Sequence, residues 1–529
     1  MAGLPNLESY LGGRWVAGTG APALLVNPAT EEPLAQIAAG GLDAGAALAH
    51  ARDVGGPALG KLTFGERAAL LRAMSRLIHA HRDELIALAM ANGGNTRGDA
   101  KFDIDGASGT LAYYADLGDK LGEARVLVDG EGVQLGRSPR LFGAHILAPR
   151  AGVAVHVNAF NFPAWGTFEK AACALLAGMP VISKPATATA LLAHRMVQLI
   201  VEAKILPPGA LQLVCGSLGD LLDHLNGQDV LAFTGSGTTG AKLRGTPRLI
   251  ERNVRVNVEA DSLNAAVLGP DVEPGSETWN LFLAEVAKDM TQKTGQKCTA
   301  IRRLIVPDAH ASAVEEALAE RLAAVVVGNP SHDDVTMGPL ATAPQLRDTR
   351  AGLARLREEA DVVAGDDGSV AAPLGAPAGK GFFLGPVLLR ARDSAAAQIV
   401  HELEVFGPVA TLLRYGAGGA RAAGALVRRA QGSLVSSLYS DDRVFLTEAV
   451  RHAAPFLGRV YVGSAKIVGQ TAGPGTVLPQ LAHGGPGRAG GGEELGGLRG
   501  LYFYMQRTAL SGDRALLDAI AGATVAVTR

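Results

Sequence analysis

The chain has 529 residues, which is enough for two or three domains. Its composition, 48% hydrophobic and 19% charged, is ordinary for a soluble globular protein and argues against a disordered chain. A formal net charge of −2 excludes an overall basic surface of the kind that binds nucleic acid.

The first half of the chain predicts a helical segment followed by alternating strands and helices. Apolar residues recur at helical spacing over 66–92. From residue 150 onward, helices are expected at 165–179 and 188–204, and strands at 152–157, 180–184, 210–214, 230–234, 255–259 and 265–269. This alternation favours a mostly parallel, doubly wound α/β sheet, in which ligands bind at the carboxyl ends of the strands.

A second α/β series follows a predicted domain boundary near 270–276, where Gly and Pro cluster. Helices are expected at 277–290 and 311–325, a loop-rich stretch at 331–380, and strands at 302–306, 386–390, 409–414, 433–440 and 458–463. After the glycine-rich run 483–497, the sequence from 501 onward is typical of a terminal edge strand.

The segment FTGSGTTG, residues 233–240, contains the pattern Gly235-x-Gly237-x-x-Gly240 directly after an apolar run. A strand, a tight glycine turn and a helix N-terminus in this order form the dinucleotide-binding fingerprint. In that fingerprint an acidic residue about twenty positions later binds the adenosine ribose. Glu251 and Glu259 are the candidates for that position.

The chain has three cysteines, Cys173, Cys215 and Cys298, too few and too scattered for a disulfide framework or a zinc site, so no metal is expected. Cys173 and Cys215 lie in apolar runs and are interpreted as structural. Cys298, in the segment GQKCT, is either a small buried hydrophobe or a nucleophile whose pKa is lowered by neighbouring charge or backbone N–H groups.

Several polar residues follow or end the expected strands. Glu259 is either a working carboxylate or a solvated strand end. Asn161 could donate to a developing oxyanion or form a turn ahead of Pro163. Lys184 could donate to a ribose or a phosphate, or be a surface cation, and the loop around Glu404 has no function that can be deduced from it in isolation.

Together and in this order, these segments resemble the aldehyde dehydrogenase superfamily over essentially the full chain. The resemblance is carried by Asn161-Phe162-Pro163, Lys184-Pro185, Phe233-Thr234-Gly235-Ser236, Glu259, Gly295-Gln296-Lys297-Cys298 and Glu404-Val405-Phe406-Gly407-Pro408. It implies an α/β aldehyde dehydrogenase fold with three parts. These are a Rossmann-like cofactor domain (1–135 and 157–273), an α/β catalytic domain (274–482) and small β-flap oligomerisation or bridging segments (136–156 and 483–529). A homodimer or a dimer of dimers is expected.

The resemblance also assigns chemical roles. Cys298 is expected to attack the aldehyde as a thiolate, with the oxyanion held by the side-chain amide of Asn161 and the backbone N–H of Cys298. Glu259 is expected to activate the water that releases the acid. Glu494 matches a family carboxylate sometimes proposed as a proton relay.

The cofactor expectations also follow from the resemblance. Glu404 and Phe406 resemble the residues that position the nicotinamide ribose and ring, and Gly235 with Ser236 borders the cofactor. Many NAD-preferring relatives carry Glu three residues after the lysine, where this chain has Thr187. Loss of that carboxylate removes repulsion toward a 2′-phosphate, so NADP is the expected cofactor, with NAD possible.

Four stretches refine the expected substrate: AFNFP, NVEADSLN, GQKCTAIRR and HGGPGRAGGGEELGG. They resemble semialdehyde dehydrogenases of bacterial aromatic degradation through CoA thioesters. The chain ends soon after its dehydrogenase part, which favours the benzoyl-CoA pathway enzyme that acts on 3,4-dehydroadipyl-CoA semialdehyde over the phenylacetate pathway enzymes. Phosphates of a CoA-bearing substrate are expected near Arg302 or Arg303.

Two other classes of function are weighed against this one. CoA-acylating relatives usually lack the general-base glutamate, so Glu259 favours hydrolysis of the thioester. A non-catalytic relative of the fold would be marked by loss of the cysteine, and Cys298 is present. No secretory signal or membrane span is visible in the sequence, so a small-molecule aldehyde is the expected partner and the cytoplasm the expected location.

Overall fold

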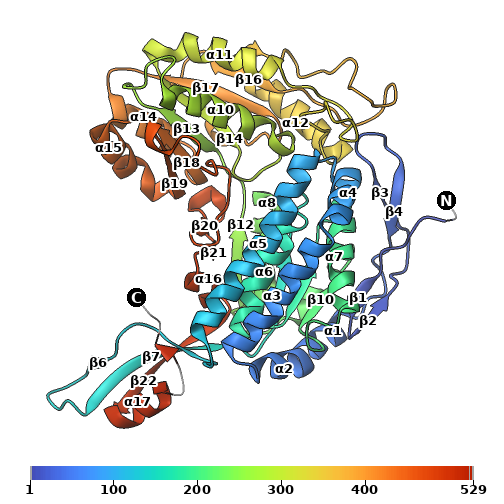
Figure 1. Cartoon of the computed structure of the whole chain (residues 1–529), viewed down its shortest axis with the longest axis vertical. Coiled ribbons are helices and arrows are strands. Elements are labelled where there is room, and N and C mark those ends of the chain that lie inside the picture. The colour runs from blue at the N-terminus through green and yellow to red at the C-terminus, as the bar shows by residue number, and fades with distance from the viewer. Residues whose placement is uncertain (1–2, 523–524, 527–529) are drawn as a thin grey trace.

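The computed structural model describes residues 3–522 and 525–526. Two seven-stranded sheets form the two main bodies of the molecule, and a smaller sheet projects away from them (Figure 1). The first sheet lies in the middle of the view behind the helices α3 to α7, and the second lies above it. The projecting flap carries β6, β7, β22 and α17.

The first sheet has the strand order β12-β11-β8-β9-β10-β1-β2. Its parallel strands are β8 (Ala154–Val157), β9 (Val181–Lys184), β10 (Leu211–Leu213), β11 (Val230–Thr234) and β12 (Arg255–Glu259). The antiparallel pair β1 (Ser9–Leu11) and β2 (Arg14–Val16) extends one edge. The doubly wound parallel arrangement expected from the apolar runs is therefore confirmed for this sheet.

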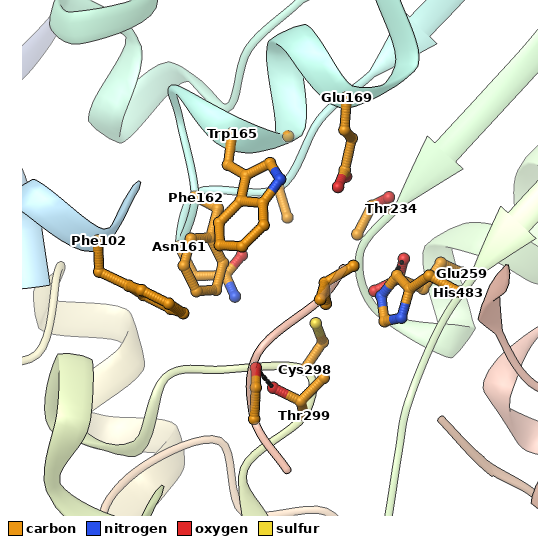
Figure 2. Close-up of a pocket in the computed structure, with 14 residues that line it drawn as sticks. Phe102, Asn161, Phe162, Trp165, Glu169, Thr234, Glu259, Cys298, Thr299 and His483 are labelled. Carbon is orange, nitrogen blue, oxygen red and sulfur yellow. Dashed lines mark hydrogen bonds and ion pairs between the residues drawn. The ribbon is translucent and has the colours of Figure 1, made fainter. Parts of the chain in front are cut away.

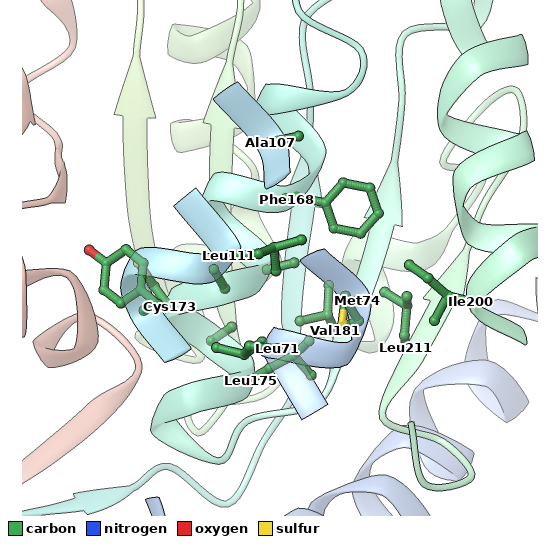
Figure 3. Close-up of a cluster of buried hydrophobic side chains, with 14 of the residues drawn as sticks. Leu71, Met74, Ala107, Leu111, Phe168, Cys173, Leu175, Val181, Ile200 and Leu211 are labelled. Carbon is green, nitrogen blue, oxygen red and sulfur yellow. The ribbon is translucent and has the colours of Figure 1, made fainter. Parts of the chain in front are cut away.

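Helices cover this sheet and bury one large apolar core (Figure 3). α3 (Phe64–Ala80) begins with a capping box, in which Thr63 and Glu66 satisfy each other's backbone N–H groups. It packs with α5 (Arg97–Leu121) and α6 (Trp165–Ala177), while α4 (Arg82–Gly93) and α7 (Ala190–Glu202) lie beside them. Cys173 and Cys215 are 3% and 0% exposed in this core, as a structural role requires.

The second sheet has the order β15-β16-β17-β14-β13-β18-β19 and is parallel except for β15. Its strands are β13 (Asn264–Leu268), β14 (Ile301–Pro307), β15 (Ala360–Ala364), β16 (Val387–Ala391), β17 (Val409–Tyr415), β18 (Ser433–Tyr439) and β19 (Leu457–Gly463). Its helices include α10 (Glu277–Thr291), α11 (Ala311–Ala323), α12 (Ala343–Leu356), α14 (Gly419–Arg428) and α15 (Arg443–Ala453).

Two sequence expectations differ from this arrangement. β13 pairs with β14 and β18, so the chain passes from the first sheet to the second at 260–263. The expected domain boundary near 270–276, with the cofactor domain ending at 273, therefore lies one strand too late. The Gly and Pro residues there mark only a turn after β13. The stretch 331–380 was expected to be loop-rich, but it contains α12 and β15, because a polar-faced helix has a weaker apolar pattern than a buried one.

The flap sheet joins segments that are far apart in the sequence. All nine residues of β22 (Met505–Asp513) pair antiparallel with β7 (Leu141–Pro149), and the expected terminal edge strand is confirmed. β5 (Leu127–Val128) and β6 (Val133–Gln134) also pair with β7, so the flap begins before residue 136. Residues 523–524 and 527–529 of the expected bridging segment lie outside the described part.

Between the bodies, β20 (Ala482–Gly484) and β21 (Glu493–Leu495) form a short antiparallel pair, followed by α16 (Leu498–Tyr502). α16 and β21 pack on α6, so this glycine-rich segment is held against the first body. None of the helices in the described part of the chain is both long enough and apolar enough to span a bilayer.

Candidate active site

The candidate site lies where the carboxyl ends of the first sheet face the loops that enter the second. Glu259 ends β12, Lys184 ends β9, and Asn161 follows β8. Because these strands are parallel, the three residues lie along one edge of the sheet. Cys298 and Glu404 come from the other side, in loops that precede the amino ends of β14 and β17.

A small enclosed cavity of about 40 Å³ lies at this meeting point (Figure 2). Its polar lining residues include Asn161, Glu169, Glu259, Cys298 and His483. Three aromatic side chains also line it, namely Phe102, Phe162 and Trp165, and Figure 2 shows them with Asn161 on the side away from Glu259 and His483. The cavity therefore brings together the three residues expected to do the chemistry, and adds two that the sequence did not indicate.

The loop that carries Cys298 is held by hydrogen bonds that join its backbone and its side chains to neighbouring segments. Asn264 Nδ2 donates to the Cys298 carbonyl at 2.7 Å, and Thr299 Oγ1 donates to the Gly475 carbonyl at 2.9 Å. Gly295 has a φ of +67°, and a Cβ there would lie 2.3 Å from the Gly407 carbonyl oxygen, so only glycine fits. The loop is thus rigidly placed before the chemistry begins.

Within this loop, Cys298 is half-buried as a residue, whereas the two core cysteines are buried. Burial raises the pKa of the Cys298 thiol, and the negative charge of Glu259 raises it further. The backbone N–H of Cys298 donates to no group among the described residues, and neither does the side-chain amide of Asn161. Two N–H donors beside the thiol are therefore free to bind an oxyanion.

Glu259 is only 3% exposed and forms an ion pair with His483, whose Nε2 lies 3.2 Å from its Oε2. Burial alone would raise the pKa of Glu259, but the charge and hydrogen bond of His483 outweigh burial, and Lys170 adds to them, so the pKa is lowered. Burial alone would lower the pKa of His483, and Glu259 raises it above its ordinary value. Glu259 is therefore a carboxylate at neutral pH, as a general base requires.

A second buried charge cluster lies behind Glu259. Lys170 Nζ is 3.1 Å from both Glu169 Oε1 and Glu494 Oε2, and Asn257 Nδ2 donates to Glu494 Oε1 at 3.1 Å. Burial raises the pKa of Glu494 to about 7, with Lys170 acting against the rise. A carboxyl group with this pKa can gain and lose a proton near neutral pH, which fits a relay.

The side of the site expected to hold the cofactor is more open. Lys184 and Thr187 are half-buried, and Ser236 is exposed. The side-chain amine of Lys184 has no hydrogen-bond or ion-pair partner in the described residues, and burial lowers its pKa. The strand ends at Lys184 and Thr234 flank β8, which lies between them in the sheet.

The glycine motif at 235–240 is a strand end followed by α8 (Gly237–Arg244). Ser236 caps α8 by accepting from the Thr239 N–H, and the Gly237 N–H donates to Asp261 Oδ1 at 2.8 Å. A Cβ on Gly240 would lie 2.8 Å from Val258 Cγ1. Gly240 therefore permits close packing of α8 on β12. Glu259, a candidate for binding the adenosine ribose in the fingerprint, instead lines the cavity beside Cys298.

Glu404 and Phe406 complete the site from the second body. Glu404 Oε2 accepts from the Ser262 N–H at 3.1 Å, while its Oε1 is buried without a hydrogen-bond partner among the described residues. Burial raises the pKa of Glu404 to about 7 against the effect of Arg302. Phe406 meets Phe160 edge-on with ring centroids 5.8 Å apart. Glu404 Oε1 lies 3.8 Å from Arg302 Nε in an ion pair, and it can still accept a hydrogen bond from a hydroxyl such as that of a ribose.

The arginines expected to meet CoA phosphates do not do so. Arg302 donates to the carbonyls of Gly407, Gly295 and Lys297, and Arg303 donates to those of Leu263, Leu426 and Val427. Both guanidinium groups are buried. Their role is to hold loops together, and that expectation is wrong because spacing along a strand does not reveal which face a side chain takes.

Sequence reasoning missed Glu169, Lys170 and His483. The adjacent Glu169-Lys170 pair stands inside an otherwise apolar helical run, and buried opposite charges in such a run are a usable signal. His483 offers no comparable local signal, because only the pairing of β20 with β21 brings it to Glu259.

The aldehyde dehydrogenase family model matches residues 15–510 of this chain. A 3,4-dehydroadipyl-CoA semialdehyde dehydrogenase of Aromatoleum evansii is 48% identical over 481 residues, covering 91% of this chain and 93% of that protein. A non-phosphorylating aspartate-semialdehyde dehydrogenase of Halomonas elongata is 27% identical over 510 residues, 94% of each chain.

Two solved structures share the fold. Betaine aldehyde dehydrogenase of Staphylococcus aureus, in complex with NAD+, superposes with a TM-score of 0.83 at 23% identity and covers 96% of this chain and 97% of that one. A 3,6-anhydro-L-galactose dehydrogenase in complex with NADP gives a TM-score of 0.82 at 24% identity, with 96% and 100% coverage. The resemblance and the fold expected from the sequence are confirmed.

Proposed function

The chain belongs to the aldehyde dehydrogenase family, and we propose that it oxidises an aldehyde to the carboxylic acid through a thioester on Cys298. One arrangement carries this proposal. A thiol, an ionised carboxylate and two unpaired N–H donors surround one small cavity. The thiolate of Cys298 adds to the aldehyde carbon, and the Asn161 amide with the Cys298 N–H binds the resulting oxyanion.

The second half of the reaction belongs to Glu259. Its carboxylate takes a proton from water, the oxygen of that water attacks the thioester carbon, and the Cys298 thiolate leaves as the acid forms. Lys170 and Glu494 lie on the far side of the cavity wall, and Glu494 is the proposed relay that accepts the proton from Glu259. Glu259 also argues against a CoA-acylating enzyme, since hydrolysis needs such a base.

A bound nicotinamide dinucleotide supplies the hydride acceptor. Its adenosine ribose is proposed to meet Lys184 and Thr187, its diphosphate region Gly235 and Ser236, and its nicotinamide ribose Glu404 Oε1, which accepts no hydrogen bond among the described residues. NADP is the proposed cofactor, because Thr187 and the unpaired Lys184 can both donate to a 2′-phosphate and no carboxylate opposes it at position 187.

The proposed substrate is 3,4-dehydroadipyl-CoA semialdehyde, the compound named in the 48% identical relative. A CoA group cannot enter a cavity of about 40 Å³, so it must lie outside. An open groove of about 640 Å³ shares Phe102 and Trp165 with the cavity. Lys101 and Lys288 are exposed on its lining, where their amines can meet phosphates. Lys101 Nζ lies 3.8 Å from Asp105 Oδ2, and Asp105 is also paired with Arg82 at 2.7 Å, so its charge is shared between two cations.

The substrate proposal is tested by matched aldehydes. We expect 6-oxohexanoyl-CoA to give a kcat/KM at least about tenfold above hexanal, the ratio that about 1.4 kcal/mol of added binding produces. The double substitution Lys101→Ala with Lys288→Ala should lower kcat/KM for the CoA aldehyde and leave hexanal unchanged. Equal kcat/KM for the two aldehydes with the unsubstituted protein would contradict a CoA-linked substrate.

A homodimer, or a dimer of dimers, is proposed on the basis of the flap, and the cytoplasm stays the proposed location. β22 is an edge strand, and other parts of the flap expose large apolar side chains, namely Val133 on β6, Leu135 after it, Leu141 on β7, and Leu516 and Ile520 on α17. An edge strand can pair with another chain, and exposed apolar side chains on the same flap are typical of a covered surface. Sedimentation analysis would give a monomer if this proposal is wrong.

A further inference from the structure

His483 is the imidazole in a cavity whose other titratable lining groups are Cys298, Glu169 and Glu259. The side-chain ligand atoms of Glu259, Cys298 and His483 all lie within 4.8 Å of one another (Figure 2). His483 is 4% exposed and is fixed by the pairing of β20 with β21. It is therefore a built part of the site and not a mobile surface side chain.

The thiol of Cys298 stands in an acidic, water-poor environment. Burial and the charges of Glu259, Glu169 and Glu404 all disfavour its thiolate. A cysteine nucleophile needs a nearby positive charge or backbone dipole to offset such effects. The question is which cation of the site is free to act on the sulfur.

The other cations near the cavity are directed at other groups. Lys293 Nζ makes no hydrogen bond among the described residues, but it lies 3.9 Å from Asp103 Oδ2 and 4.5 Å from the centroid of the Phe162 ring. Lys170 is paired with Glu169 and Glu494. Arg302 donates to backbone carbonyls, and Arg459 donates to the carbonyls of Pro474 and Thr476 at 2.6 Å each. His483 alone among these groups binds the carboxylate that neighbours the sulfur.

We infer that His483, as an imidazolium paired with Glu259, stabilises the thiolate of Cys298 and fixes Glu259 beside it. The Cys298 proton passes to the Glu259 carboxylate: the S–H bond breaks, an O–H bond forms, and the thiolate remains next to the imidazolium. His483 is thus a positioning residue for both halves of the reaction. The inference rests on the roles proposed above for Cys298 and Glu259.

The pH dependence follows from the groups that face His483. Glu259 on β12, Glu169 on α6 and Glu494 on β21 favour its charged form, while Arg459 on β19 opposes it. Burial also opposes the charge, but the carboxylates prevail and the pKa of His483 is raised above its ordinary value. The imidazolium is present below that pKa, and its support of the thiolate is lost as the pH rises through it.

Alkylation of Cys298 by iodoacetamide tests this role without turnover, because Cys173 and Cys215 are buried in the core. With His483→Phe, alkylation at pH 7 should be about tenfold slower and its pH midpoint about one unit higher, since one unit corresponds to a tenfold change in thiolate fraction. His483→Gln should slow alkylation equally and retain more kcat, because an amide can still hold Glu259 but carries no charge. His452→Phe, on the surface helix α15, is the matched control and should alkylate like the unsubstituted protein.

An alkylation profile of His483→Gln within twofold of the unsubstituted protein, with the same midpoint, would overturn the inference, and this variant decides the matter if His483→Phe does not fold. The proposed function fails by a different result, namely full turnover by Cys298→Ala. The two failures are therefore distinguishable.

Discussion

The two halves of the site hold their polar groups in different ways. In the chemical half, Glu259 is buried and paired with His483, and Asn161 and Cys298 line an enclosed cavity. In the proposed cofactor half, Lys184, Thr187 and Ser236 are half-buried or exposed, and the Lys184 amine has no partner in the described residues. Electrostatic interactions are strong in a site of low dielectric, so its polar groups should contribute much to the rate. Polar groups open to water interact more weakly, so they should discriminate between ligands by smaller energies.

The largest effect is expected at the nucleophile. Cys298→Ala should lower kcat by at least about 10⁴-fold, the scale seen when an enzyme loses its nucleophile. No other thiol can replace it, because Cys173 and Cys215 are buried in the core. Steady-state formation of reduced cofactor measures the loss, and Cys215→Ala, which should keep its turnover, is the control. If Cys298→Ala kept its activity, Cys298 would not be the nucleophile and the cavity would not be the site of the reaction.

The next effect is expected at the base. Glu259→Gln should lower steady-state turnover by about 10²–10⁴-fold, the usual contribution of a general base. A burst of reduced cofactor should remain but form more slowly, because the amide no longer accepts the Cys298 proton, whereas hydrolysis of the thioester loses its base altogether. Since the pKa of Glu259 is lowered, the carboxylate persists through neutral pH and the unsubstituted protein should keep its deacylation rate there, losing it only as the pH falls through that low pKa. Rapid-mixing kinetics measure burst and slow phase separately.

The same variant separates hydrolysis from acyl transfer to CoA. If free CoA restored rapid turnover to Glu259→Gln, the thioester would be passing to CoA and Glu259 would not be the productive base. An unchanged steady-state rate without CoA would equally contradict its role.

The oxyanion donor should give the third effect. Asn161→Ala is expected to lower kcat by about 10²–10³-fold, as removal of one such donor does. Its side chain has no hydrogen-bond partner among the described residues, so Tm should change little. Thermal unfolding and kcat measured on the same sample test both statements, and a large fall in Tm with a small fall in kcat would make Asn161 a structural residue.

The strand side of the site could be predicted from the sequence, and the loop side only by resemblance. Glu259, Lys184 and Asn161 end or follow apolar runs, and parallel pairing brings such ends to one edge. Cys298 precedes its strand, and its position depends on Gly295 and on bonds from Asn264 that no local pattern reveals. The domain boundary was expected after β13 for a similar reason, because an apolar run predicts a strand but does not indicate which sheet the strand joins.

The long-range pairing of β20 with β21 explains what was missed in the chemical half. The register of this pair places His483 opposite Glu494. His483 also forms an ion pair with Glu259, which is far away in the sequence. A glycine-rich run has no periodicity from which such a register could be inferred. Buried charge networks of this kind are visible only once the partner strands are in place.

The smallest effect is expected in the open half. Thr187→Glu puts a carboxylate at the start of a short helical turn after β9, where it should repel a 2′-phosphate and accept from ribose hydroxyls. The ratio of kcat/KM for NADP to that for NAD should fall by about tenfold, equivalent to about 1.4 kcal/mol. Thr447→Glu, on the surface helix α15, controls for the added charge and should leave the ratio unchanged. A higher kcat/KM for NAD with the unsubstituted protein would refute NADP preference, and an unchanged ratio in Thr187→Glu would show that cofactor choice is made elsewhere along this edge.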